Sequence, residues 1–203
     1  TPEECLAFMA DSANEASALE TATALLEARY VAGDAVLANL FLKRDLEDFF
    51  KKRGKTFVEA KLEEAIVRHR RQGMSVYHTQ PNLKDSRGAL RDYQLAVWID
   101  RASQLSGHLP RLAKRPLVSQ AAIEEARHGY ERILTLRTAL HGVCGRKQDV
   151  FDYAMQQALA EELSIAPTED LRGSEVLLRE YFRAATAVHR LADTVIRRYR
   201  EEQ

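Results

Sequence analysis

Cysteine is scarce in this chain: two occur among 203 residues, Cys5 and Cys144, and they form no C-x-x-C pattern. Two isolated thiols in helical surroundings are typical of buried, reduced side chains and of a reducing compartment. Long apolar runs are missing as well, since no segment approaches the roughly 20 apolar residues that span a bilayer, and no charged-then-apolar leader opens the chain. We therefore expect a soluble, cytoplasmic protein without a membrane partner.

An excess of either charge is also absent. The 30 Lys and Arg residues balance the 30 Asp and Glu residues, so the formal net charge is zero. Such a chain has no overall field that attracts nucleic acid or acidic lipid, and we expect neither as a partner. With 45% hydrophobic residues, the chain is long enough to bury a substantial core.

Residue sets that carry hydrolytic or metal chemistry are missing. The histidines include no His-Asp dipeptide and no H-E-x-x-H pair, which excludes metal-dependent phosphohydrolase and zinc protease sites. A nucleotidyltransferase palm needs a Gly-Ser turn followed by two carboxylates one residue apart that hold a divalent metal. Gly173-Ser174 is followed by a helical pattern without a D-x-D pair. We therefore predict no catalytic residue and no metal ligand in this chain.

Apolar residues recur at helical spacing almost throughout, whereas strand signal is nearly absent. Tyr181, Val188 and Val195, for example, share one face of the last helix. We predict an all-α protein, with a single helical domain over residues 1–203 and a bundle of about six to seven helices. One irregular Pro/Gly loop runs from Pro81 to Gly88, and a second is expected from Ser106 to Pro116. The predicted helices, with ends defined to ~2–4 residues, cover 3–30, 34–52, 56–72, 89–105, 119–142, 147–163 and 174–201.

The most informative stretch is the segment Pro81–Asp92, which places cations and a glycine at the start of a helix. A helix start exposes unpaired backbone N–H groups and the positive end of the macrodipole. Gly88 would let the main chain approach a ligand closely, and Lys84, Arg87 and Arg91 could add positive charge. The pattern favours phosphate binding, with a capped, solvated turn as the alternative.

A second basic pair precedes this loop. Lys61 and Arg68 are seven residues apart and so share a helix face, from which both could point towards the triphosphate of a nucleotide. The alternative is a solvated basic helix end, where the cations of Arg68–Arg71 suit the C-terminal dipole.

Four further residues are interpreted as structural. Trp98, on the helix that follows the loop, is expected to anchor the core rather than to stack on a base. His141 is expected to be a partly buried structural histidine. Asp149 is expected to cap or pair with Arg146 in an ordinary ion pair.

The loop resembles the N-[IVL]-K-x-x-x-G-G-L-R-D signature of the bacterial PII uridylyltransferase/uridylyl-removing enzymes. The likeness continues in family order through most of the chain: Thr23–Arg29, Gly33-Asp34, Lys61–Glu64, Arg68-His69, Gly73, Tyr77, Arg137–His141, Gly145-Arg146, Asp149, Gln157, Ala160 and Glu175–Val188. The loop departs from the signature at Gln80, where the family has Glu, at Arg87, where it has Pro, and at Ala89, where it has a second Gly. Alanine at that position implies that φ is not positive there, or that the backbone approaches its ligand less closely.

This resemblance implies a parent enzyme of nitrogen regulation that uses Mg²⁺ to transfer UMP from UTP to a tyrosine of the PII signalling protein. It also implies that the chain is the helical domain after the nucleotidyltransferase palm, inactive alone, with HD and ACT domains downstream. The palm would hold most of the Mg²⁺ and UTP, while Asn82 would fix a loop whose Lys84, Arg87 and Arg91 lie near the triphosphate. Because the chain does not begin with Met, we expect it to be part of a longer protein.

Two alternatives stay open. The glutamine synthetase adenylyltransferases carry a looser form of the same motif, so the parent could transfer AMP or another nucleotide. The chain could also be a purely structural or regulatory bundle, in which the loop packs the palm against downstream sensor domains and binds no nucleotide.

Overall fold

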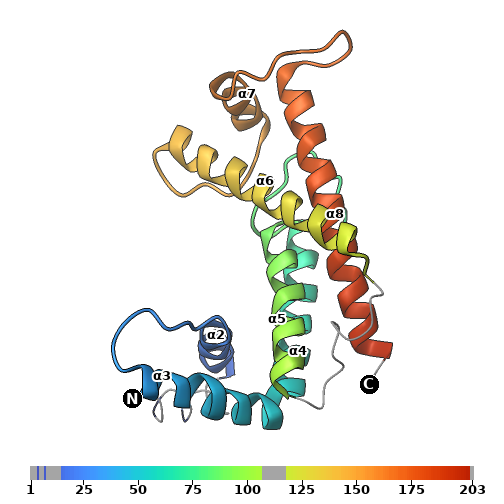
Figure 1. Cartoon of the computed structure of the whole chain (residues 1–203). Helices are drawn as coiled ribbons and strands as arrows, with labels where there is room; N and C mark the ends of the chain where they lie inside the picture. The colour runs from blue at the N-terminus through green and yellow to red at the C-terminus, as the bar shows by residue number, and fades with distance from the viewer. Residues whose placement is uncertain (1–3, 5–6, 8–14, 107–117, 202–203) are drawn as a thin grey trace. The chain divides into compact units, whose positions relative to one another are not determined.

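The computed structural model describes residues 4, 7, 15–106 and 118–201, and most of these residues are helical (Figure 1). The elements are α2 (Glu15–Leu26), α3 (Ala35–Leu40), the π-helical segment η2 (Phe41–Asp45), α4 (Leu46–Gln72), α5 (Leu90–Ser106), α6 (Gln120–Cys144), α7 (Tyr153–Glu162) and α8 (Gly173–Glu201). No strand occurs in these ranges, where the only β contact is an isolated antiparallel bridge between Asn82 and Val150. The prediction of an all-α fold is confirmed.

Two predicted helix boundaries are wrong. The break expected between residues 52 and 56 does not exist, because the helix continues through Gly54 to the end of α4. A glycine inside a helix costs about 1 kcal/mol, and here it is offset by packing on both sides, where the Phe50 and Phe57 rings meet edge to face at 5.3 Å. The helix expected from residue 147 begins only at Tyr153, after Asp152 has capped it by accepting the N–H of Met155.

Some predictions lie outside the described residues. These are the beginning of the helix expected over 3–30, Cys5, and all but the first residue of the loop expected over 106–116. Within that range the structure describes Glu4 and Ala7, which are helical, and α2, which ends at Leu26.

The contacts group the chain into two compact units. Of the described residues, one unit takes 4, 7, 15–64, 97–106 and 195–201, and the other takes 65–96 and 118–194. Helices α4, α5 and α8 contribute residues to both units. A single domain over 1–203 therefore stays a prediction.

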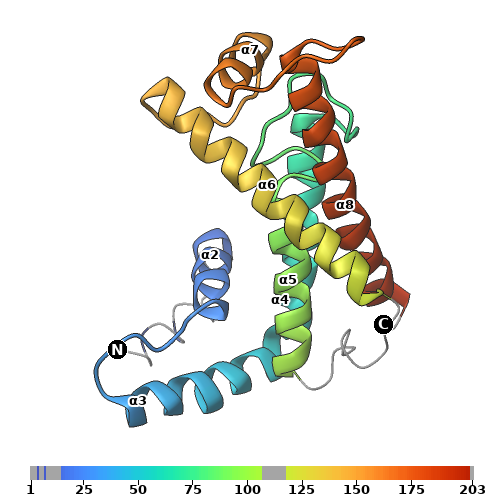
Figure 2. The same ribbon diagram turned by 45° about the horizontal axis from the view of Figure 1, so that its top comes forward.

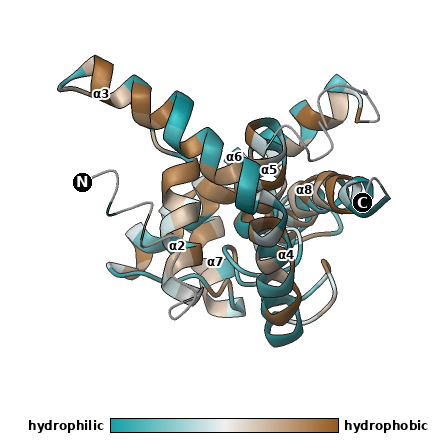
Figure 3. Ribbon diagram, turned by 90° about the horizontal axis from the view of Figure 1, so that it is seen from below, coloured by the Kyte–Doolittle hydropathy of each residue, from teal (hydrophilic) through white to brown (hydrophobic). Residues whose placement is uncertain are grey.

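In the first unit the end of α2 contacts α5, where Arg101 Nη1 donates to the Leu26 carbonyl at 3.3 Å. Trp98 is 5% exposed, and its indole N–H donates to Glu27 at 2.8 Å. The prediction that Trp98 anchors the core is confirmed. Helix α3 leaves Val36, Leu37 and Leu40 exposed, and it carries brown, hydrophobic bands in Figure 3.

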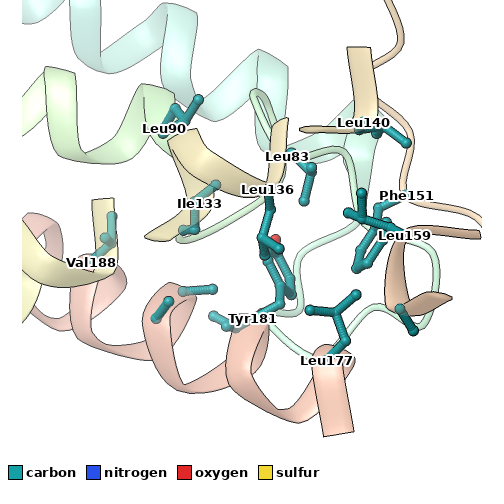
Figure 4. Packing of buried hydrophobic residues seen from close by; sticks show 14 residues of the cluster. Leu83, Leu90, Ile133, Leu136, Leu140, Phe151, Leu159, Leu177, Tyr181 and Val188 are labelled. Carbon is teal, nitrogen blue, oxygen red and sulfur yellow. The ribbon is translucent and has the colours of Figure 1, made fainter. Parts of the chain in front are cut away.

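The second unit has the larger described core. In its main hydrophobic cluster, the largest fully buried side chains come from the loop before α5, from the segment between α6 and α7, and from α6, α7 and α8 (Figure 4): Leu83, Ile133, Leu136, Leu140, Phe151, Leu159, Leu177 and Tyr181. Helix α6 crosses α8 (Figure 2), and the crossing is tight at Gly129, where a Cβ would lie 2.7 Å from the carbonyl oxygen of Ala184. Leu83 sits within this core, so the loop is part of the folded unit and not an appendage.

Candidate functional site

The loop before α5 is shaped by its own side chains. The Asn82 side-chain oxygen accepts the backbone N–H groups of Lys84 and Asp85, at 3.0 and 2.8 Å. The Ser86 hydroxyl accepts the N–H of Asn82 at 2.9 Å. Side chains of Asn and Ser commonly organise turns in this way. Asn82 therefore sets the path of the loop.

The same loop is tied to the segment that connects α6 and α7. The N–H of Leu83 donates to the Asp149 carbonyl at 2.7 Å, and the N–H of Phe151 donates to the Pro81 carbonyl at 2.8 Å. The buried Gln156 amide donates to the carbonyls of Thr79 and Phe151, at 2.7 and 2.8 Å. These contacts explain why residues 147–152 are not helical, since their backbone groups serve the loop.

The family likeness had pointed to the neighbouring glutamine. Gln157 is exposed and donates to Glu161 on its own helix at 2.7 Å, whereas Gln156 is 3% exposed and joins two segments. Sequence reasoning missed Gln156, although its position on the apolar side of α7, beside Leu159 and Ala160, was a usable signal.

Gly88 lets the main chain approach another group closely, as predicted, but that group belongs to α8 and not to a ligand. Its φ is +76°, and a Cβ on it would lie 2.3 Å from the carbonyl oxygen of Ala185. Its N–H donates to the Asp92 carboxylate at 2.7 Å. Ala89 does not have a positive φ, which confirms the first explanation of the departure at that position.

The backbone donors at the start of α5 are all used inside the protein. Gly88 donates to Asp92, and the next four N–H groups donate to the carbonyls of Ser86, Leu83, Lys84 and Ala89 in that order. The premise that this helix start carries unpaired N–H groups is therefore wrong. A phosphate at this loop would have to be held by side chains.

Asp92 is the most enclosed charge of the second unit. Its carboxylate, 2% exposed, receives Arg68 Nη2 at 2.5 Å and contacts His69 Nε2 at 2.8 Å, in addition to Gly88. Burial by itself raises the pKa of Asp92, but the hydrogen bond to His69 and the charges of His69 and Arg68 outweigh it and hold that pKa below its usual value. Asp92 is ionised and neutralises Arg68.

The remaining candidate cations differ in how they are engaged. Lys61, in the first unit, is 5% exposed, pairs with Glu64 and lies 4.5 Å from the centre of the Trp98 ring. Like Arg68, it is held by partners inside the protein. The loop cations are partly exposed: Arg87 donates to the Met74 carbonyl at 3.0 Å, and the main chains of Lys84 and Arg91 are joined at 3.0 Å. Among the described residues, the Lys84 ammonium has no hydrogen-bond or ion-pair partner.

Asp149 is paired, but with a different arginine from the one expected. It accepts Arg137 Nε at 2.7 Å and contacts His141 Nε2 at 3.2 Å, whereas Arg146 is exposed. Burial raises the pKa of Asp149, but the hydrogen bonds with Arg137 and His141 prevail and lower it. Pairing with Arg146 was wrong because α6 brings Arg137 closer. The prediction of a partly buried structural His141 is confirmed.

An open groove lies on α8, and sequence reasoning did not identify it. Its volume is about 410 Å³, and it is lined by Tyr77, Glu125, Arg179, Phe182, Arg183, Thr186, Ala187 and Arg190. The signal was present, because arginines at positions 179, 183 and 190 share one helix face.

No group of three or more His, Cys, Asp or Glu side chains in these ranges could hold a metal ion. None of the described helices combines the length and the apolar character that crossing a membrane requires.

Comparison with known proteins gives one consistent result. Residues 56–196 match the family model described as GlnD PII-uridylyltransferase. The chain is similar to the bifunctional uridylyltransferase/uridylyl-removing enzymes of Burkholderia mallei (strain ATCC 23344) and Burkholderia pseudomallei (strain K96243), with 36% identity over 174 residues. That match covers 86% of this chain and 20% of each relative, so the chain spans about a fifth of their length. No solved structure matches it.

Proposed function

Because this chain belongs to the GlnD PII-uridylyltransferase family, we propose that it is the helical part of an enzyme that transfers UMP from UTP to the PII signalling protein. The proposal includes a nucleotidyltransferase palm in the same polypeptide, which would hold Mg²⁺ and most of the UTP. It also includes a cytoplasmic location. The proposal rests on the names of the relatives, which include the word uridylyltransferase. It extends to a whole enzyme, because each relative is about five times as long as the part that matches this chain.

Within that enzyme, the loop from Asn82 to Arg91 borders the nucleotide cleft. The observation that carries this role is Lys84, a partly exposed ammonium without a partner among the described residues, on a loop whose backbone is fixed by Asn82. A cation held in place needs little reorganisation when negative charge arrives, which is the useful property in phosphoryl-type transfer. Arg87 and Arg91, which are also partly exposed, add positive charge to the same loop.

A specific observation favours a second candidate, the structural bundle. Gly88 meets the Ala185 carbonyl, and the N–H groups from Gly88 to Asp92 are all used internally. Those features need no ligand. In that role the loop joins α5 to α8 and contacts no nucleotide.

Substitution of Lys84 in the intact enzyme separates the two roles. A hydrogen bond to a charged group contributes roughly 1.5–3 kcal/mol, so Lys84→Ala should raise the KM for UTP about tenfold to a hundredfold. The melting temperature should change little, because the side chain is partly exposed. Lys147→Ala removes an exposed lysine outside the loop and is the matched control.

A different result would favour the structural role. If Lys84→Ala and Arg91→Ala leave KM and kcat unchanged while lowering the melting temperature, the loop is structural. Incubation of the intact enzyme with labelled UTP or ATP tests the nucleotide, and transfer from ATP alone would replace the uridylyl assignment with an adenylyl one.

A further inference from the structure

The groove on α8 concentrates positive charge in a chain whose net charge is zero. Arg179, Arg183 and Arg190 line it and are exposed, whereas Glu125 is its single carboxylate. We propose that this groove binds an extended acidic segment of a partner protein, with an apolar side chain of that segment placed against Tyr77 and Phe182. The inference does not depend on the nucleotidyl transfer proposed above.

The arginines have no carboxylate partners among the described residues, and the nearby acids explain why. Glu180 pairs with Arg132 of α6, and Glu175 pairs with Arg172 at 3.3 Å. These two carboxylates of α8 are thus engaged elsewhere, whereas Asp193, three residues after Arg190, is exposed and forms no ion pair among the described residues. An arginine without a carboxylate partner readily forms a pair of parallel hydrogen bonds with a carboxylate of a ligand.

The spacing of the arginines suits an extended chain better than a single phosphate. Arg179 and Arg190 are eleven residues apart on one helix face, which is about 16 Å along the axis. An extended peptide rises about 3.3 Å per residue, so about five residues span that distance. Alternate carboxylates of such a peptide reach successive guanidinium groups, whereas one phosphate could not contact the outer arginines together.

The aromatic pair gives the groove an apolar end. Tyr77 is 62% exposed, and its ring meets that of Phe182 edge to face, with centroids 5.5 Å apart. The Tyr77 backbone is fixed by its N–H, which donates to the Ser75 hydroxyl at 3.0 Å. A large exposed aromatic ring next to arginines is the composition of a protein contact, where Tyr and Arg supply much of the binding energy.

Binding of a labelled peptide to the full chain tests the proposal. The probe is an eight-residue peptide of Glu and Asp with one central Leu, measured by fluorescence anisotropy at low salt. Each exposed ion pair contributes roughly 0.2–1 kcal/mol, so the triple variant Arg179→Gln, Arg183→Gln and Arg190→Gln should bind about threefold to 150-fold more weakly. Tyr77→Ala should weaken the binding of this peptide more than the binding of a peptide in which Gln replaces the central Leu.

The control is a second triple variant with the same change of charge at exposed arginines outside the groove: Arg29→Gln, Arg53→Gln and Arg146→Gln. It should bind like the unsubstituted chain. Circular dichroism checks that each variant folds, and Arg183→Gln alone replaces the triple if that variant does not.

Three results would overturn the inference. They are absence of peptide binding at millimolar concentration, equal loss of affinity in the two triple variants, and competition by tripolyphosphate or UTP at concentrations at which free glutamate has no effect. The last result would assign the groove to a phosphate-bearing small molecule. None of these measurements uses UMP transfer, so failure here leaves the test of Lys84 unaffected.

Discussion

Gly88 and Ala185 are in contact through main-chain atoms: a Cβ on residue 88 would lie 2.3 Å from the Ala185 oxygen and 2.9 Å from its carbonyl carbon. Backbone cannot withdraw as a flexible side chain can. The loop before α5 and the middle of α8 therefore fit together only when residue 88 is glycine, and the positive φ of Gly88 adds a second reason.

Gly88→Ala should lower the free energy of unfolding by about 3 kcal/mol, from the strained φ and the overpacking together. Urea denaturation of the full chain measures it. Gly142→Ala is the control, because a Cβ there meets nothing within 4 Å and alanine favours a helix. That variant should be as stable as the original chain or up to about 1 kcal/mol more stable. Equal effects of the two substitutions would show that the contact with Ala185 is not tight.

Gln156→Ala should destabilise the chain by about 2 kcal/mol, because it leaves the carbonyls of Thr79 and Phe151 without their buried donor. Gln157→Ala removes an exposed amide one residue away and should change stability by less than about 0.5 kcal/mol. Thermal unfolding of both variants gives the comparison. A larger effect at Gln157 would contradict this assignment.

Acid should weaken the second unit through Asp92 and Asp149, whose pKa values are both lowered in the folded chain. A carboxyl with a depressed pKa adds stability above its unfolded pKa of about 3.9, and this stability is lost as the pH falls through the folded value. The unfolding free energy should therefore decrease below about pH 4.

Asp92→Asn isolates the contribution of that carboxylate. The variant should be less stable near pH 7 by about 3 kcal/mol, because it leaves Arg68 buried without a counter-charge. Its stability should also depend less on pH below about pH 4 than that of the original chain. Asp85→Asn, on the same loop, is the control. Parallel pH profiles for Asp92→Asn and the original chain would exclude Asp92 as the titrating group.

Tyr181 is fully buried, and its hydroxyl has no hydrogen-bond partner among the described residues. Burial raises the pKa of Tyr181 above its usual value. Tyr181→Phe should raise the free energy of unfolding by about 1 kcal/mol, and with it the melting temperature. The substitution keeps the aromatic packing and removes an unsatisfied polar group. Tyr153→Phe, at an exposed tyrosine, should have no comparable effect. A lower melting temperature for Tyr181→Phe would indicate that its hydroxyl is bonded after all.

Helical periodicity was sufficient to predict the fold class and most elements, because a 3.6-residue pattern is a local property. It failed at residues 147–152 because Phe151 and Asp149 bond to residues near Pro81, and no local pattern reports such a contact. The sequence also could not show what engages Lys61 and Arg68, two of the candidate cations. The spacing of Lys61 and Arg68 gives their shared face, whereas Trp98 and Asp92, their partners, lie on the next helix.

The bond from Gln156 to Thr79 joins residues 77 positions apart in the sequence. Contacts of such long range form late, after the intervening chain has closed a large loop. On a ribosome, the segment around Asn82 could not take its final shape until α7 had been synthesised and released. The cations of this loop thus reach their final positions only when the whole unit has folded. A nascent chain that ends within α6 would contain the loop sequence but could not form the loop structure.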